Sequence, residues 1–148
     1  MAKRGRHQSD CRVFLDANVL FSAAYQEQAG LATLWKLRGV HLVTSLYAVQ
    51  EAATNLNKED AQSRLRDLIE EVEIIPDVLG IDTRTLDELA EIVLPDKDRP
   101  ILAAAVAAKA DFLLTGDIQH FGRYFGQLLC EVRVLRPAEF LKSLAEWR

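Results

Sequence analysis

Two short, mainly apolar runs that each lead to an acidic residue constrain the fold of this 148-residue chain more than any other feature. The first run, at residues 12–15, is followed at once by Asp16 and then Asn18, and the second, at residues 112–115, leads to Asp117. A short apolar run that stops at a helix-initiating residue is typical of a buried parallel strand. In open α/β sheets, ligands bind at the carboxyl edge of the strands. The pattern therefore predicts two strands that each carry an aspartate to one edge of a sheet.

The composition is that of a single globular domain. With 49% hydrophobic and 27% charged residues, the chain resembles neither a disordered nor a membrane protein. The longest apolar stretch, at residues 101–108, is much shorter than the roughly 18 residues that span a bilayer, so we expect a buried helix there. No apolar signal region follows the basic N-terminus. We therefore expect a mobile tail at residues 1–11, one domain at residues 12–148 and a cytoplasmic location.

Charge and cysteine content argue against a strongly basic nucleic-acid binder and against a disulfide-rich or zinc-knuckle protein. A net charge of -4 argues against a protein that holds nucleic acid by bulk electrostatics, but it does not exclude nucleic acid. Acids can be concentrated in a metal pocket while Lys and Arg line its rim. Cys11 and Cys130 are too few and too far apart for a disulfide framework or a metal knuckle, so we interpret them as buried strand thiols.

Predicted strands and helices alternate along the chain. We expect strands at residues 12–15, 41–44, 73–76, 112–115 and 131–135. The expected helices cover residues 18–25, 29–38, 46–56, 58–72, 83–93, 100–108 and 138–146, with a loop or short helix at 118–125. This alternation requires parallel pairing with right-handed crossovers. It predicts an α/β fold in which a parallel five-stranded sheet lies between two helical layers.

Acidic side chains are the main candidates for chemistry. Two lie at strand ends, and two are assigned to the first turns of helices that begin at the same edge of the sheet: Asp16, Glu51, Asp98 and Asp117. Clustered carboxylates without histidine or cysteine suit hard cations, so Mg²⁺ or Mn²⁺ is the expected occupant. Without a metal, their mutual repulsion would push one or more of them toward protonation. Spacing alone is equally compatible with helix caps and surface charge.

Other catalytic motifs are absent from the sequence. There is no GxGxxG motif, no P-loop and no GxSxG nucleophile elbow. His120 follows Asp117 closely and is a candidate neighbour of a substrate, although a loop histidine is the simpler interpretation.

Four segments taken together resemble the PIN-domain ribonucleases, which include the VapC-type toxins of toxin–antitoxin pairs. The segments are residues 14–20, 45–51, 98–105 and 114–117, and the similarity extends over residues 12–140. The resemblance implies a sheet of order 3-2-1-4-5 with an acidic metal pocket at the strand C-termini. It also implies an endoribonuclease that depends on Mg²⁺ or Mn²⁺ and cleaves single-stranded RNA to 5′-phosphate and 3′-hydroxyl ends. A protein antitoxin and a homodimer are the expected partners.

The resemblance also suggests roles for individual residues. The four acids of the family, expected to be metal ligands, are matched by Asp16, Glu51, Asp98 and Asp117. Asn18 and Thr115 match polar positions that support the pocket. Candidates for phosphate contacts with RNA are Lys97, Arg99, Lys109 and Arg123, although each is also compatible with ordinary solvated charge.

Two alternative functions and one residue assignment remain open at this point. The chain could be a catalytically inactive PIN-like binding module, or a Mg²⁺-dependent phosphatase on a similar sheet. Phosphatases of the haloacid-dehalogenase type carry Asp-x-Asp at the first strand end, and here Asn18 stands two positions after Asp16. Asp96 competes with Asp98 for the third acidic position. We favour Asp98, because Pro100 sets the helix start just after it.

Overall fold

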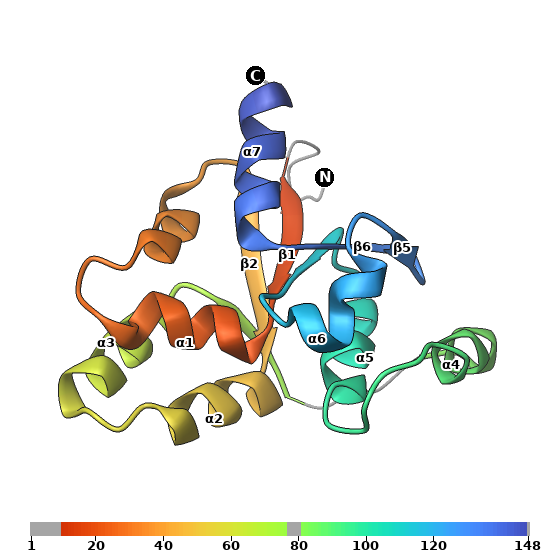
Figure 1. Ribbon diagram of the computed structural model, residues 1–148, viewed down its shortest axis with the longest axis horizontal. Coiled ribbons are helices and arrows are strands. Elements are labelled where there is room, and N and C mark those ends of the chain that lie inside the picture. Colours follow the sequence, from red (N-terminus) through yellow and green to blue (C-terminus); the bar gives the residue numbers. More distant parts are fainter. Residues whose placement is uncertain (1–9, 77–80, 148) are drawn as a thin grey trace, which may run out of the picture.

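The computed structural model describes residues 10–76 and 81–147, in which one sheet lies between helices. The N-terminal half contains β1 (Cys11–Leu15), α1 (Ala17–Tyr25), the 3₁₀ helix η1 (Gly30–Lys36), β2 (Val40–Ser45), α2 (Leu46–Asn55), α3 (Glu59–Ile69) and β3 (Glu73–Ile75). The C-terminal half contains α4 (Thr83–Ala90), α5 (Arg99–Ala107), β4 (Phe112–Leu114), α6 (Ile118–Phe121), the 3₁₀ helix η2 (Gly122–Tyr124), β5 (Leu128–Leu129), β6 (Val132–Leu135) and α7 (Pro137–Trp147). Helices α1, α2 and α3 lie on one side of β1 and β2, and α4, α5 and α6 on the other (Figure 1).

The sheet has six strands in the order β3-β2-β1-β4-β6-β5. All neighbouring strands run parallel except β5 and β6, which are antiparallel. The α/β class and the order of the predicted strands are confirmed, since β3, β2, β1, β4 and β6 follow the expected 3-2-1-4-5 sequence. The prediction of only five strands was wrong, because β5 adds a short hairpin strand at the edge. A strand of two residues is too short to produce an alternating pattern.

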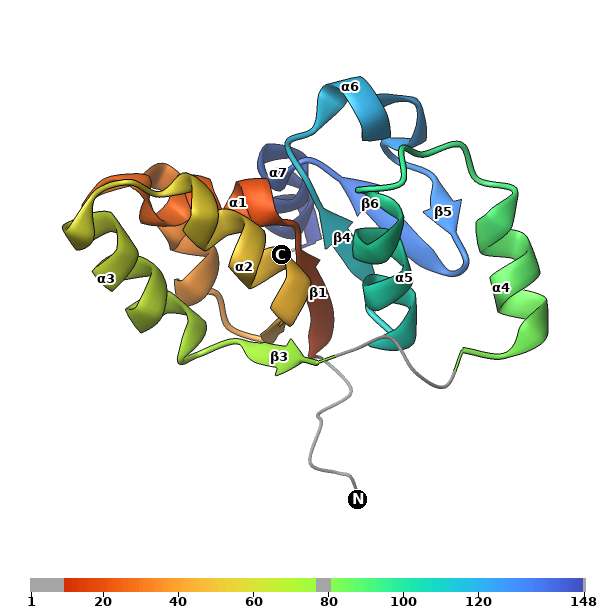
Figure 2. The same ribbon diagram turned by 90° about the horizontal axis from the view of Figure 1, so that it is seen from below.

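Burial explains why the first apolar run forms the centre of the sheet. In β1, Val13, Phe14 and Leu15 have no exposed surface, because the strand has neighbours on both sides and helices on both faces. Helix α5 packs closely on the sheet because its buried positions include Ala104 and Ala105. The view from below shows α5 beside β4, across the sheet from α1 and α2 (Figure 2).

Three further predictions need correction. The helix expected at residues 29–38 is the 3₁₀ helix η1, whose preceding residue Ala29 has no side chain that can accept a capping hydrogen bond. The helix expected at residues 83–93 ends at Ala90. Cys130 lies in the turn between β5 and β6 rather than in a strand, and both cysteines are only partly buried.

The predicted N-terminal tail falls largely outside the described residues, which begin at position 10. Cys11, the last residue assigned to that tail, is the first residue of β1. In the described part of the chain, no helix combines the length and the apolar character needed to cross a membrane.

Candidate functional site

The ends of β1 and β4 bring the first two polar residues of the site together. Leu15 is paired with Leu114 in the parallel register, so Asp16 and Thr115 leave the sheet side by side. The Thr115 hydroxyl donates a hydrogen bond of 2.8 Å to Oδ2 of Asp16, and both side chains are buried. The backbone N–H of Ala17 donates to Oδ1 of Asp16 at 2.6 Å, where Asp16 caps α1. Both carboxylate oxygens of Asp16 are therefore held in fixed positions.

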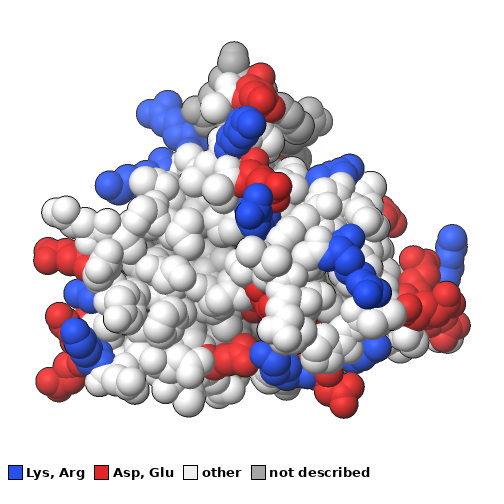
Figure 3. Space-filling model, viewed as in Figure 1, with Lys and Arg blue, Asp and Glu red and all other residues white. Residues whose placement is uncertain are grey.

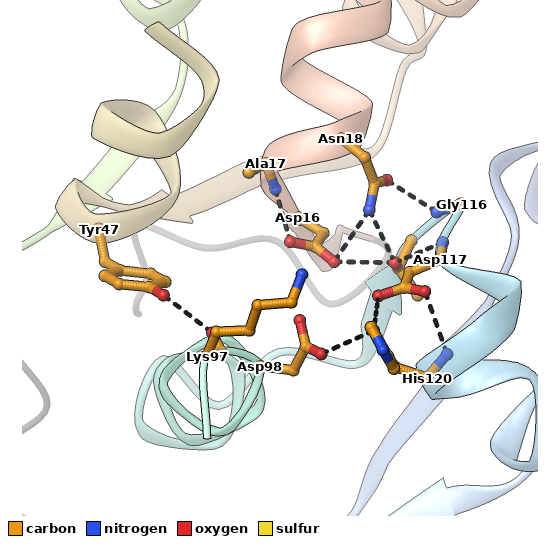
Figure 4. Close-up of polar contacts among 10 residues, drawn as sticks. Asp16, Ala17, Asn18, Tyr47, Lys97, Asp98, Gly116, Asp117 and His120 are labelled. Carbon is orange, nitrogen blue, oxygen red and sulfur yellow. Dashed lines mark hydrogen bonds and ion pairs between the residues drawn. The ribbon is translucent and has the colours of Figure 1, made fainter. Parts of the chain in front are cut away.

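Asn18 links the ends of the same two strands from the first turn of α1. Its side-chain amide donates hydrogen bonds to Oδ2 of Asp16 and to Oγ1 of Thr115, and each is 3.2 Å long. Its side-chain oxygen accepts a 2.8 Å hydrogen bond from the backbone N–H of Gly116. The close-up view shows Asn18 above this group of contacts (Figure 4). Asn18 and Thr115, the two positions predicted to support the pocket, thus both contact Asp16.

Burial strongly changes the acidity of Asp16. Loss of solvent around this carboxyl raises its pKa from 3.8 to about 6, against the hydrogen bonds from Thr115 and Ala17, which lower it. The negative charges of Asp98 and Glu51 raise the pKa of Asp16 further. Such a buried, like-charged environment is typical of functional carboxylates.

Asp98 reaches the same edge from the start of α5. It occupies the N-cap position, but its side chain makes no capping hydrogen bond, and Pro100 follows in the first turn. The side chain is 9% exposed, and burial raises its pKa, while the neighbouring charge of Lys97 lowers it. Oδ2 of Asp98 is buried and accepts no hydrogen bond from the described residues. This unsatisfied oxygen fits a cation ligand.

Asp117 and His120 complete this part of the site on α6. Asp117 caps the helix by accepting the backbone N–H of His120 on Oδ1 at 3.0 Å. Nδ1 of His120 lies 2.8 Å from Oδ2 of Asp117 and 3.0 Å from Oδ2 of Asp98. One donor atom from each of the three residues lies within 4.8 Å of the other two. The composition of this cluster, two carboxylates and an imidazole, is suited to a divalent cation.

His120 is the site residue that sequence reasoning undervalued. The sequence favours a loop histidine and leaves a neighbour of the substrate as the alternative, whereas His120 is the third residue of α6 and contacts two of the four predicted acids. The available signal was the spacing of three residues from Asp117, which places the two side chains on one face of a helix.

A single pocket of about 460 Å³ brings the four predicted acids together. Glu51 enters it from the second turn of α2, not from the first turn as expected. The lining residues are Asp16, Ala17, Asn18, Phe21, Glu51, Ala52, Asn55, Lys97, Asp98 and Asp117. In the space-filling view, acidic side chains are visible in the hollow between the two halves of the molecule, with basic side chains beside them (Figure 3).

Of the four predicted RNA-contacting cations, Lys97 is the one that lines this pocket. Its side chain points toward Asp16 and Asp98, and its backbone carbonyl accepts a 2.9 Å hydrogen bond from the Tyr47 hydroxyl (Figure 4). Arg99 instead donates to the carbonyl of Leu89, at the end of α4, and to that of Ile92, just beyond the helix.

The other two predicted cations lie elsewhere. Lys109 follows the far end of α5 and lines a separate pocket of about 380 Å³. Arg123 is exposed on η2, with its guanidinium carbon 6.0 Å from the ring centre of Tyr124. The geometry therefore brings Lys97 to the acids and leaves Lys109 and Arg123 outside the pocket.

Comparison with known proteins identifies the family and similar folds. The family model described as PIN domain matches residues 12–119. No curated protein sequence matches the chain. Among solved structures, a toxin–antitoxin complex from Klebsiella pneumoniae has a chain with 21% identity and a TM-score of 0.62, over 84% of this chain and 97% of that chain.

Two other solved structures show the same fold. A chain of VapBC2 from Rickettsia felis, solved with a DNA fragment from its promoter, has 18% identity and a TM-score of 0.61, over 84% of this chain and 98% of that chain. A chain of VapBC-1 from nontypeable Haemophilus influenzae has 16% identity and a TM-score of 0.56, over 86% of this chain and 98% of that chain.

Proposed function

The chain belongs to the PIN-domain family, and from this premise we propose that it is a metal-dependent endoribonuclease that cleaves single-stranded RNA. The observation that carries the proposal is the shared pocket of Asp16, Glu51, Asp98 and Asp117. Four carboxylates in one pocket repel one another strongly unless cations or protons offset their charge. A phosphodiester bond is a suitable substrate, because its anionic phosphate needs the same positive charge.

The four acids would hold Mg²⁺ or Mn²⁺, and the unsatisfied Oδ2 of Asp98 supports this assignment. When bound, such a cation supplies activation of water and stabilisation of charge on the phosphate. Asn18 and Thr115 keep Asp16 oriented toward the pocket. The ammonium group of Lys97, which lines the pocket, would contact a phosphate oxygen of the RNA. The expected products carry 5′-phosphate and 3′-hydroxyl ends.

We propose further that the protein is the toxin of a toxin–antitoxin pair, restrained by a protein antitoxin. The support is the fold, which resembles chains of VapBC and other toxin–antitoxin complexes. A homodimer is the expected state of the toxin. Light scattering at micromolar concentration tests the homodimer, and a monomer would contradict it.

RNA cleavage assays test the main proposal. Structured and unstructured RNAs should be incubated with Mg²⁺, with Mn²⁺ and with a chelator. We expect cleavage of unstructured RNA that requires the cation and is lost in Asp16→Asn. Asp67→Asn, on the exposed side of α3, is a matched control and should cleave normally.

Two alternative functions predict different results. A phosphatase would hydrolyse small phosphomonoesters in the same buffers and leave RNA intact. An inactive binding module would bind RNA or a protein partner without cleaving either kind of substrate. Either outcome would contradict the nuclease proposal.

A further inference from the structure

We propose that His120 is a metal ligand, and that the site for this reason binds Mn²⁺ in preference to Mg²⁺. The inference rests on the proposed function, because two members of the cluster, Asp98 and Asp117, line the proposed catalytic pocket, and His120 contacts both of them from its edge. It goes beyond the four acids, since it adds a nitrogen ligand and a choice of metal.

The first argument is the distance of His120 from two carboxylates. Nδ1 lies 2.8 Å from Oδ2 of Asp117 and 3.0 Å from Oδ2 of Asp98. Two ligands at right angles on a cation, each about 2.1 Å from it, are about 3 Å apart. The two distances therefore fit the separation expected of neighbouring ligands on one cation. Figure 4 shows the imidazole directed at both acids, which stand at the N-cap positions of α5 and α6.

The second argument is that a single hydrogen on Nδ1 does not satisfy both carboxylates. Nδ1 carries at most one hydrogen, and in the tautomer that has it this hydrogen faces the nearer acceptor, Oδ2 of Asp117. Oδ2 of Asp98 is then left without a hydrogen bond, in a side chain that is only 9% exposed to solvent. A buried acceptor without a partner is costly and calls for an explanation such as an ion. A cation placed among the three donor atoms would interact with all of them at once.

The third argument is that the local fold fixes the position of His120. Its backbone N–H donates to Oδ1 of Asp117, the residue that caps α6 directly after β4. The side chain is 23% exposed and stays within the cluster. His41 offers a contrast, because its side chain is 48% exposed and its Nε2 contacts a single carboxylate, that of Glu73, 2.8 Å away.

Ligand chemistry then gives the choice of metal. Mg²⁺ prefers oxygen ligands and keeps several waters, whereas first-row transition metals accept imidazole nitrogen readily. Mn²⁺ combines an affinity for carboxylates with acceptance of nitrogen. A set of two carboxylates and one imidazole should therefore favour Mn²⁺ over Mg²⁺ more than carboxylates alone would.

The test measures metal binding rather than cleavage. Calorimetric titrations with Mn²⁺ and with Mg²⁺ compare the wild type, His120→Gln and the control His41→Gln. We expect His120→Gln to weaken Mn²⁺ binding roughly tenfold or more, on the scale of altered metal-site residues, and Mg²⁺ binding by a smaller factor. His41→Gln should bind both metals as the wild type does.

Pulsed EPR of the Mn²⁺-loaded protein gives the direct signature. We expect ¹⁴N coupling to Mn²⁺ in the wild type and in His41→Gln, and its loss in His120→Gln. If His120→Gln does not fold, a wild-type spectrum without ¹⁴N coupling would still overturn the inference. Mn²⁺ that binds without nitrogen coupling, or equal losses of Mn²⁺ and Mg²⁺ affinity in His120→Gln, would overturn the inference.

Failure of the proposed nuclease function and failure of the His120 ligand would give different results. A protein with nitrogen-coupled Mn²⁺ that cleaves no RNA would contradict the nuclease and retain the ligand. A nuclease whose Mn²⁺ shows no nitrogen coupling would retain the function and remove His120 from the ligands.

Discussion

The hydroxyl of Thr115 lies 2.8 Å from Oδ2 of Asp16, and this hydrogen bond joins two strand ends that are 99 positions apart in the chain. Asp16 is 3% exposed, so the Thr115 hydroxyl supplies a hydrogen bond that water would give to an exposed carboxylate. A hydrogen bond to the ionised carboxylate favours its charged form. Thr115 therefore keeps the pKa of Asp16 lower than burial alone would leave it.

The first prediction concerns the loss of this hydroxyl. Thr115→Val keeps the shape of the side chain but leaves Oδ2 of Asp16 with a weaker set of donors. We expect a loss of about 1–3 kcal/mol in the free energy of unfolding at pH 7.5, measured by urea denaturation without metal. Thr115→Ser should retain most of that stability. A loss as large at pH 4.5, where Asp16 is protonated, would show that the hydroxyl does not act on the carboxylate.

The second prediction is the pH dependence of the metal-free protein. The pKa of Asp16 is about 6 when folded and near 3.8 when unfolded, so the folded state binds more protons between these values. The contribution of protonated Asp16 to stability is complete below about pH 4 and lost as pH rises through 6, an upper bound of about 3 kcal/mol.

Asp16→Asn tests this linkage, because it removes the titrating group. Denaturation with a chelator present should show the variant gaining stability relative to the wild type between pH 4.5 and pH 7.5. A difference between the two proteins that stays constant with pH would contradict the raised pKa.

The third prediction concerns metal linkage. Because a cation relieves the repulsion among the acids, added Mg²⁺ or Mn²⁺ should raise the melting temperature. The rise should be smaller in Asp117→Asn, which lacks one carboxylate of the cluster. Differential scanning fluorimetry at fixed ionic strength measures both shifts. Equal shifts in the two proteins would place the cation elsewhere.

Much of the fold follows from local patterns. Apolar runs next to acids predicted β1 and β4, because a central parallel strand is buried on both faces and its polar residues collect at its end. Alternation of strands and helices then restricted the topology, and parallel register brought Asp16 and Asp117 to one edge. These features depend on residues that are close in sequence or on general rules of connection.

The rest depends on contacts that a sequence does not show. Arg99 was expected at the rim, but its guanidinium donates to the carbonyls of Leu89 and Ile92, which lie at the end of α4 and just beyond it. Terminal carbonyls of a helix lack internal donors, so a nearby arginine satisfies them. The contact of His120 with Asp98 likewise joins residues 22 positions apart, which only the folded chain brings together.

The fourth prediction concerns the turn between β5 and β6. Cys130 and Glu131 have φ values of 49° and 70°, a left-handed conformation that two-residue hairpins require and that glycine adopts without strain. Glu131→Gly should raise the free energy of unfolding by about 0.5–1 kcal/mol, after the entropic cost of glycine is included. Glu131→Ala keeps the strain and should change stability by no more than a few tenths of a kcal/mol. An equal effect of both substitutions would exclude backbone strain as the cause.

The last prediction separates Asp96 from Asp98, which stand two positions apart before α5. The Asp98 side chain is buried and lines the pocket, whereas the Asp96 side chain is fully exposed and its Oδ1 lies 4.0 Å from the guanidinium of Arg99. If Asp98 is a metal ligand, Asp98→Asn should reduce cation-dependent RNA cleavage about a hundredfold or more, on the scale of several kcal/mol of lost charge stabilisation. Asp96→Asn should change it little, because an exposed ion pair of this length contributes little energy. Initial rates at saturating metal measure both effects, and the reverse order would mean that α5 begins one turn earlier and presents Asp96 to the cation.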